Sequence, residues 1–320
     1  MKNILTAFCI VMLLSLLGAQ SVPPQKEKRQ DIQGTITISG AFALYPMVMK
    51  WSEEFRKLHP RVRFDISAGG AGKGIADALA DMVDIGMVSR DIHPVELRKG
   101  AWFIAVTKDA VVPVINQGNP LARTLRIKGL KKTDFIRIWL DETPLTWNEL
   151  ASVKGSVPVH VYTRSDSCGA AETWALFLGK MQEDLLGIGV FGDPGLNDAV
   201  RKDALGIGFN NINYAFDTVT LKPISGTAIL PIDLNGNGRI DAAEDFYGHR
   251  DALVKAIADD RYPSPPARDL YFVCRGRPQK KLLAAFMKWV LGDGQKFVGA
   301  AGYIALPAGK LAQGLKNIGQ

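Results

Sequence analysis

The segment SGAFALYP (residues 39–46) passes from a strand-like stretch through a turn of small residues into an amphipathic helix. The same pattern recurs in AGGAGKG (residues 68–74) and in RSDSCGAA (residues 164–171). Small side chains let a ligand approach the backbone, and a helix N-terminus offers unpaired N–H groups with a partial positive charge. Three such turns aimed at one point predict a binding site for an anion.

Strand-like and helical segments alternate along the first part of the chain. Apolar spacing predicts strands at residues 35–38, 62–66 and 83–88 and helices at residues 46–58 and 74–82. This order is typical of an α/β fold with parallel strands. Ligands bind such sheets at the carboxyl ends of the strands, which is where the small-residue turns lie.

The length of the chain predicts two lobes. A chain of 320 residues exceeds one hydrophobic core of ordinary size. The apolar segment at residues 103–106, which leads into a second one at 110–116, and the strand-like segment at 269–274 are interpreted as two crossings between the lobes. We expect hinges near residues 106–110 and 266–271. Lobe 1 is then expected to combine residues 31–107 and 271–320, and lobe 2 to span residues 108–270.

The N-terminus has the features of a secretory signal peptide. Lys2 precedes an apolar run and then small residues, so residues 1–19 are predicted to be the signal, with cleavage near Ala19. The apolar run is too short to span a bilayer as a helix, and an uncleaved membrane anchor is the alternative. Residues 20–30 are polar and contain prolines, which predicts a flexible lead-in. We expect the mature protein to be exported to the periplasm or the cell exterior.

The charge of the chain favours an anionic partner. The formal net charge is +7, and it falls to +6 when Lys2 is removed with the signal. A modest positive charge suits a small anion or an anionic membrane surface. The basic residues are scattered, with no basic run interleaved with aromatic residues, so nucleic acid is not an expected partner. We expect a monomer.

Five segments, taken in order, resemble the phosphate-binding PstS proteins. They are SGAFALYP (39–46), VDIGMVSR (83–90), TRSDSCG (163–169), LGIGFNNI (205–212) and the strand at residues 270–274. The resemblance implies a two-lobed, type II periplasmic-binding-protein fold of the α/β class, with a mixed sheet flanked by helices in each lobe. It also implies an exported solute-binding protein, not an enzyme, that captures phosphate or a related oxyanion between the lobes and delivers it to the permease of an ABC importer.

The resemblance assigns an anion site to the loops, and several side chains depart from the family's pattern. Ala43 or Leu44 stands where the family has a hydroxyl, and Ala71 stands where it has a serine. Ser89 replaces an aspartate, and residues 168–170 read Cys-Gly-Ala in place of Ser-Gly-Thr. A fully deprotonated oxyanion or a larger anionic solute is therefore an alternative to phosphate. The implied anion-binding residues are Ala43, Leu44, Tyr45, Ala71, Gly72, Ser89, Arg90, Arg164, Asp166, Cys168, Gly169 and Ala170.

Arg164 provides most of the side-chain argument for an anion site. Its planar guanidinium can hold two oxygens of one anion, and Asp166 can orient it. The alternative is an ion pair of Arg164 with Asp166 or Glu172 on a surface turn. Arg90 is a second candidate cation, and Tyr45 is a candidate to close the pocket.

The segment DLNGNGRIDAAE (residues 233–244) fits the pattern of a calcium-binding loop. Oxygen-bearing side chains occupy positions 1, 3, 5, 9 and 12, with glycine at position 6 and an aliphatic residue at position 8. Residues 242–258 are expected to be largely helical, and a lone loop of this kind is expected to stabilise the fold. The alternative is a turn rich in Asn and Gly. The predicted Ca²⁺ ligands are the side chains of Asp233, Asn235, Asn237, Asp241 and Glu244 and the carbonyl of Arg239.

Two other classes of function fit parts of the sequence. One is an exported scaffold stabilised by calcium. The other is an enzyme, in which Cys168 at a helix N-terminus has a depressed pKa and acts as a nucleophile. Cys168 and Cys274 remain after signal removal, and a disulfide between them is also open. The candidate bases for the enzyme are His59, His93, His160 and His249.

Overall fold

The computed structural model describes residues 32–319. The predicted signal peptide (1–19) and lead-in (20–30) lie outside the described residues. Within residues 32–319, no helix has the length and apolar character needed to cross a membrane.

The described chain forms a nine-stranded mixed sheet in the order β2-β1-β3-β9-β4-β7-β5-β6, with β8 paired to β4. Strands β1, β2 and β3 pair in parallel, as do β5, β6 and β7. Strand β9 is antiparallel to both β3 and β4, and β4 is antiparallel to β7 and β8. The strands are β1 Gly34–Gly40, β2 Val62–Ala68, β3 Ile85–Val88, β4 Ala101–Asn116, β5 His160–Arg164, β6 Ile188–Val190, β7 Gly206–Asn211, β8 Thr227–Ile229 and β9 Ala267–Arg275.

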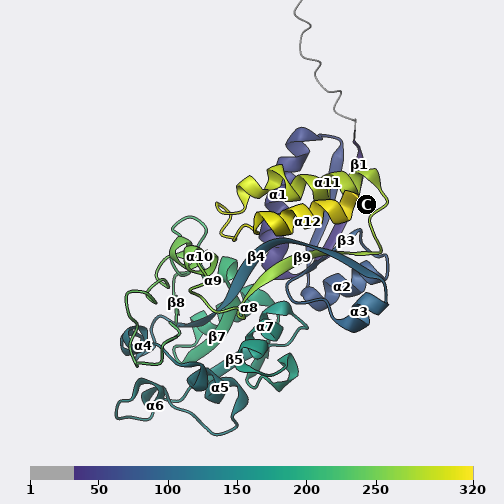
Figure 1. Ribbon diagram of the computed structural model, residues 1–320. Helices are drawn as coiled ribbons and strands as arrows, with labels where there is room; N and C mark the ends of the chain where they lie inside the picture. The colour runs from purple at the N-terminus through teal and green to yellow at the C-terminus, as the bar shows by residue number, and fades with distance from the viewer. Residues whose placement is uncertain (1–31, 320) are drawn as a thin grey trace, which may run out of the picture. The chain divides into compact units, whose positions relative to one another are not determined.

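Helices flank both halves of this sheet. Figure 1 shows α1, α11 and α12 together on one side of the β1–β3 region, with α2 on the other side. The α-helices are α1 Tyr45–Leu58, α2 Ala71–Leu79, α3 Pro94–Arg98, α4 Ala122–Lys128, α5 Lys132–Leu140, α6 Trp147–Ala151, α7 Gly169–Leu178, α8 Gly192–Lys202, α9 Ile212–Ala215, α10 Arg250–Ala258, α11 Lys281–Leu291 and α12 Ala308–Gly319. Short 3₁₀ helices are η1 Phe42–Leu44, η2 Gln182–Asp184 and η3 Asp293–Phe297.

The buried apolar side chains form two separate cores, which define the two lobes of an α/β fold. The core of lobe 1 draws on residues 36–106 and 270–318. The core of lobe 2 draws on residues 110–267 together with Ile304. Strands β4 and β9 run side by side and contribute to both cores (Figure 1). Their role as hinges stays a prediction.

Helix α2 begins at Ala71, one turn before the predicted start at Gly74. The glycines are part of the helix because it packs directly against the sheet. A Cβ on Gly74 would lie 2.4 Å from the Met87 carbonyl oxygen and 2.8 Å from the Gly40 Cα atom. The predicted strand at 83–88 is also shorter, since β3 begins at Ile85 after a turn.

The predicted helix over residues 242–258 is wrong in its first half. Residues 242–249 form turns, and α10 begins at Arg250 after a cap in which the His249 ring accepts the Asp251 N–H. Phe246 and Tyr247 are buried in the core of lobe 2. Turning these two large rings inward interrupts the helical path.

Candidate functional site

The small-residue loops of the two lobes meet directly. The Gly72 N–H of α2 donates to the Ser167 carbonyl oxygen at 3.2 Å. A Cβ on Gly70, whose φ is +91°, would lie 2.7 Å from that same oxygen. On the other side of the loop, a Cβ on Gly169 would lie 2.1 Å from the Ser89 carbonyl oxygen. The absence of side chains at these glycines therefore permits the contact between the lobes.

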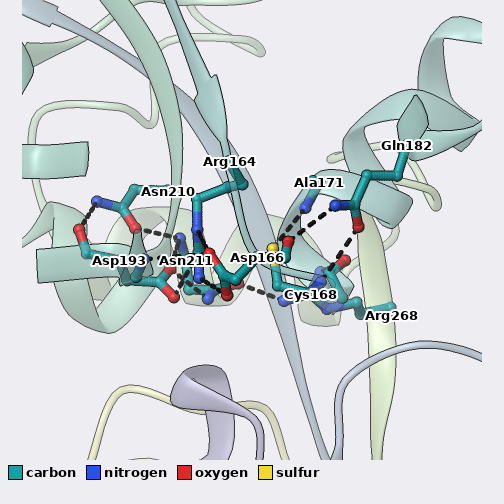
Figure 2. Close-up of polar contacts among 11 residues, drawn as sticks. Arg164, Asp166, Cys168, Ala171, Gln182, Asp193, Asn210, Asn211 and Arg268 are labelled. Carbon is teal, nitrogen blue, oxygen red and sulfur yellow. Dashed lines mark hydrogen bonds and ion pairs between the residues drawn. The ribbon is translucent and has the colours of Figure 1, made fainter. Parts of the chain in front are cut away.

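Arg164, at the end of β5, is fully buried between two carboxylates. Its Nε and Nη2 atoms donate to Asp166 at 2.8 and 2.7 Å, and its Nη1 atom donates to Asp193 at 2.9 Å (Figure 2). Burial opposes the charged form, but the carboxylates of Asp193 and Asp166 outweigh it and raise the pKa of Arg164. Glu172, the other ion-pair partner considered from the sequence, contacts Arg90 and His93 instead.

The guanidinium of Arg164 keeps capacity for a further acceptor. A guanidinium has five N–H donors, and the carboxylates of Asp166 and Asp193 accept from three of them. Of the two remaining N–H groups, one belongs to Nη1 and the other to Nη2, and each can donate a charge-assisted hydrogen bond to an anion. The ring of Phe42, from the first small-residue loop (residues 39–46), lies with its centroid 5.8 Å from the Arg164 Cζ atom.

The ion pairs of Arg164 continue into a second buried arginine. Asp193 accepts the side-chain N–H of Asn211 at 2.5 Å, and the Asn211 side-chain oxygen accepts from Arg268 on β9 (Figure 2). Arg268 Nε donates to Asp109 on β4 at 3.1 Å, and its Nη1 donates to the Gly169 carbonyl at 2.6 Å. These contacts tie β4 and β9 to the first residue of α7.

The charges of this buried network do not balance. The carboxylates of Asp109, Asp166 and Asp193 outnumber the guanidiniums of Arg164 and Arg268 by one. Burial raises the pKa of Asp109 to about 6, Arg268 opposes the shift, and the nearby charge of Asp193 adds to it. The network can therefore lose its excess negative charge by protonating Asp109 at mildly acidic pH.

The first loop places apolar groups where the family pattern has hydroxyls. Ala43 and Leu44 are buried in the core of lobe 1, and Tyr303 donates its hydroxyl to the Ala43 carbonyl at 2.8 Å. Phe42 packs edge-on against Tyr214, with ring centroids 6.3 Å apart. Burial raises the pKa of Tyr214, and the charges of Asp193 and Tyr45 add to this effect.

Arg90 belongs to a different ion-pair group. It contacts both oxygens of Glu96 at 2.6 and 2.9 Å, and its Nε lies 3.0 Å from Glu172 on α7. His93 Nε2 lies 2.9 Å from the other oxygen of Glu172. Arg90 therefore joins the lobes through Glu172 and does not contact Arg164. Ser89, which directly precedes Arg90, is buried beside Gly169.

Cys168 has the opposite pKa shift to the one expected at a helix N-terminus. Burial raises the pKa of its thiol to about 12, Arg164 opposes the shift, and Asp166 adds to it. The Sγ atom accepts the Ala171 N–H at 3.4 Å, so the thiol caps α7. Cys168 and Cys274 are both free, with no disulfide between them.

Several residues of this network were missed in the sequence. Asp109 interrupts an apolar run, and Arg268 directly precedes the predicted strand at residues 269–274, so the available signal was a charged residue within or beside an apolar segment. The side chain of Gln182 forms two hydrogen bonds with the third small-residue loop (residues 164–171). It donates to the Asp166 carbonyl at 2.8 Å and accepts the Cys168 N–H at 3.1 Å. The other missed residues are Phe42, Asp193, Asn210, Asn211 and Tyr214.

A two-lobed α/β fold with a buried charged site where loops of both lobes meet is the architecture of a solute-binding protein. The chain belongs to the PBP superfamily, whose domain model matches residues 25–294.

The chain is also similar to named members of this class. It is 23% identical over 325 residues to the phosphate-binding protein PstS of Xylella fastidiosa (strain Temecula1), a match covering 92% of this chain and 86% of that protein. It is 25% identical over 327 residues to the PstS of Pseudomonas aeruginosa (strain PAO1), covering 92% and 90%. A putative phosphate ABC transporter substrate-binding protein from Clostridium perfringens, solved with bound phosphate, has the same fold. Its TM-score is 0.70 at 20% identity, and the match covers 86% of this chain and all of that one.

The raised pKa of Asp109 predicts a pH-dependent stability. Because the folded state binds this proton more tightly than the unfolded chain, the contribution is fully present below about pH 4 and is lost as pH rises through about 6. Wild type should therefore gain stability relative to Asp109→Asn as pH falls from about 7 to about 4, by up to about 3 kcal/mol. Denaturant unfolding of both proteins across this range measures the difference.

Asp65→Asn is the matched control, because Asp65 is exposed on β2. Its difference from wild type should show no step near pH 6. A wild-type minus Asp109→Asn difference that is flat with pH, or that grows as pH rises, would contradict the assignment.

Proposed function

We propose that this chain is an exported solute-binding protein that captures phosphate or a related oxyanion at Arg164 and delivers it to an ABC importer. The observation that carries the proposal is the guanidinium of Arg164, which is buried where loops of both lobes meet and keeps one unused N–H donor on each of Nη1 and Nη2. The names of the PstS relatives support phosphate as the first ligand to test.

The buried carboxylates shape the expected preference of the site. Asp166 and Asp193 already neutralise Arg164, and the wider network holds one excess negative charge. A dianion would meet this charge without a compensating cation, whereas a singly charged oxyanion meets less repulsion. We therefore propose a singly charged form, such as dihydrogen phosphate, as the preferred ligand. Binding should then strengthen as pH falls toward about 6, where Asp109 protonates.

The loss of side-chain hydroxyls sets the expected affinity. Ala43, Leu44, Ala71 and Ala170 have no side-chain donor. Each charge-assisted hydrogen bond that is not formed forfeits about 1.5–3 kcal/mol. The backbone N–H groups of the loops remain as donors, so a larger anionic solute with more contacts is the alternative ligand.

The neutral thiol of Cys168 counts against an enzyme. Its pKa of about 12 leaves almost no thiolate at neutral pH, and the thiolate is the nucleophilic form. His160 contacts Asp203 at 2.7 Å, and His93 contacts Glu172. A binding role is therefore the better explanation for this site.

The cellular setting is part of the same proposal. Residues 1–19 would act as a signal peptide cleaved near Ala19, which places the mature protein in the periplasm or outside the cell. It would work there as a monomer with the permease of an ABC importer as its partner.

Removing Arg164 should abolish most oxyanion binding. Calorimetric titration of ligand-free protein with phosphate, sulfate and molybdate should give heat with at least one of them. Arg164→Ala should weaken that binding by at least about 2 kcal/mol, or roughly thirtyfold. This change leaves Asp166 and Asp193 buried without a partner. Arg164→Lys is therefore measured in parallel, because lysine keeps the positive charge but lacks the planar set of guanidinium N–H donors.

Arg123→Ala is the control, since Arg123 is an exposed arginine of lobe 2. It should bind as wild type does. No heat from any oxyanion with protein shown to be ligand-free, or unchanged affinity in folded Arg164→Lys, would rule out an oxyanion site at Arg164.

We further propose that ligand binding closes the lobes about residues 106–110 and 266–271. Glu172 on α7 contacts Arg90 and His93 of lobe 1, and the Gly72 N–H contacts Ser167 of lobe 2. These contacts join the lobes in the described structure, and an open form would have to break them.

Small-angle scattering tests this closure. The radius of gyration of ligand-free protein should decrease when the ligand identified by calorimetry is added. Glu172→Gln weakens the contact between the lobes, so it should need more ligand for the same contraction. Glu183→Gln, at an exposed glutamate of the same lobe, should behave as wild type. Equal radii of gyration with and without saturating ligand in all three proteins would contradict a closing motion.

A further inference from the structure

Four acidic residues of the described chain are buried, and they divide into two pairs. Asp109 and Asp193 each contact a buried arginine, at 3.1 and 2.9 Å. Asp233 and Glu244 are only 4% and 5% exposed, yet no basic side chain among residues 32–319 forms an ion pair with either. Buried charges in proteins are usually paired or coordinate metals, and a cation is the partner that these two carboxylates lack within residues 32–319.

Both unpaired carboxylates lie in one loop, residues 233–244, and a third approaches them. The Asn235 side-chain nitrogen lies 3.0 Å from Asp241 Oδ2 and 3.3 Å from Glu244 Oε2. Two carboxylates thus converge on a single amide group. The side chain of Arg239 forms an ion pair with Asp241 at 2.9 Å and is 73% exposed. An exposed arginine of this kind screens Asp241 but does not compensate the two buried acids.

The backbone holds these acids in place. Asp233 accepts the N–H groups of Gly236 and Gly238 at 2.8 Å each. Glu244 Oε1 accepts the N–H groups of the residues following Asp233, at 2.8 and 3.0 Å. Gly238, at the sixth position, has a φ of +84°, which is the sharp turn that a calcium loop makes there. Ile240, at the eighth position, donates its N–H to the Ile127 carbonyl at 2.8 Å and so anchors the loop to the end of α4.

We propose that this loop binds one Ca²⁺ ion. Calcium takes six to eight hard oxygen ligands in a flexible geometry, whereas magnesium demands a smaller octahedron. A half-turn of the Asn235 and Asn237 amides would exchange their nitrogens for oxygens, and the two groups cannot be told apart by shape. The ligands are then the side-chain oxygens of Asp233, Asn235, Asn237, Asp241 and Glu244 and the carbonyl of Arg239.

The ion would stabilise lobe 2 by joining both ends of the loop. The Asp233 N–H donates to the Leu130 carbonyl at 2.9 Å, which fixes the incoming end. Glu244 lies two residues before Phe246, which is buried in the core of lobe 2 with Tyr247 and packs edge-on against Tyr262. Within residues 32–319, no residue of the loop hydrogen-bonds or forms an ion pair with Arg164 or its carboxylates, so the ion should leave oxyanion affinity unchanged.

Thermal unfolding of the full mature protein in chelator and in millimolar calcium tests this site. With a dissociation constant on the order of 10⁻⁴–10⁻³ M, millimolar calcium should raise the melting temperature by about 1–5 °C. Calorimetry with calcium alone should show one site, and magnesium at the same concentration should give a smaller shift. Glu244→Gln should lose most of the shift, because it removes the charge and one oxygen of the carboxylate.

Asp245→Asn is the matched control, since Asp245 is exposed, adjacent to Glu244 and outside the loop. It should keep the full calcium shift. If Glu244→Gln does not fold, Asp241→Asn replaces it, with the same loss expected. Equal melting temperatures of wild type in chelator and calcium together with no calorimetric heat, or an equal shift in Glu244→Gln and Asp245→Asn, would overturn the proposal.

Discussion

The contact of Arg164 with Asp166 and Asp193 is the constraint on which the functional part of the structure depends. A buried guanidinium is unfavourable unless its charge is balanced, and these carboxylates balance it from the third loop and from α8. Asp193 in turn organises Asn211, which binds Arg268. One ion pair therefore links the end of β5 to β7 and to β9, one of the two strands that contribute to both cores.

This network explains why a solute-binding site can survive the loss of family side chains. The position of Arg164 is set by its carboxylates rather than by a ligand, so the site is organised in advance. The same network also limits the charge of the ligand, because its excess negative charge disfavours an anion that carries two negative charges. Affinity for an anion must then come from the two free N–H groups and the surrounding backbone.

Buried charge is handled in two ways in lobe 2. Asp109 and Asp193 are matched by arginines from distant parts of the chain, which ties strands together. Asp233 and Glu244 lie eleven residues apart in one loop, where they accept backbone N–H groups and, at Glu244, the side-chain N–H of Asn235. In the first arrangement each carboxylate contacts a guanidinium of the chain, whereas the second is the place where we propose a Ca²⁺ ion.

Much of the fold could be predicted from the sequence, because the spacing of apolar residues distinguishes helices from strands locally. The α/β class, the two lobes and the parallel strands β1–β3 were all predicted. The antiparallel pairing of β4 with β9 was not, since it joins residues about 160 positions apart and leaves no local pattern. The early start of α2 was missed because Gly72 and Gly74 are poor helix formers. Their value lies in close packing, of Gly74 against β1 and β3 and of Gly72 against Ser167 of the other lobe.

The candidate site was only partly visible in the sequence for the same reason. Arg164 and Asp166 lie in one short loop and were found together. Asp193, Arg268 and Asp109 reach the network only through the fold, so no spacing rule connects them. The buried environment of Cys168, which reverses its expected pKa shift, is likewise a tertiary effect.

A crystal structure of the protein grown with the oxyanion that binds it tests the central claim most directly. The account predicts tetrahedral density within about 3 Å of Arg164 Nη1 and Nη2, with Asp166 and Asp193 still in contact with the same guanidinium. Density at another place in the protein, with Arg164 contacting only its two carboxylates, would contradict it.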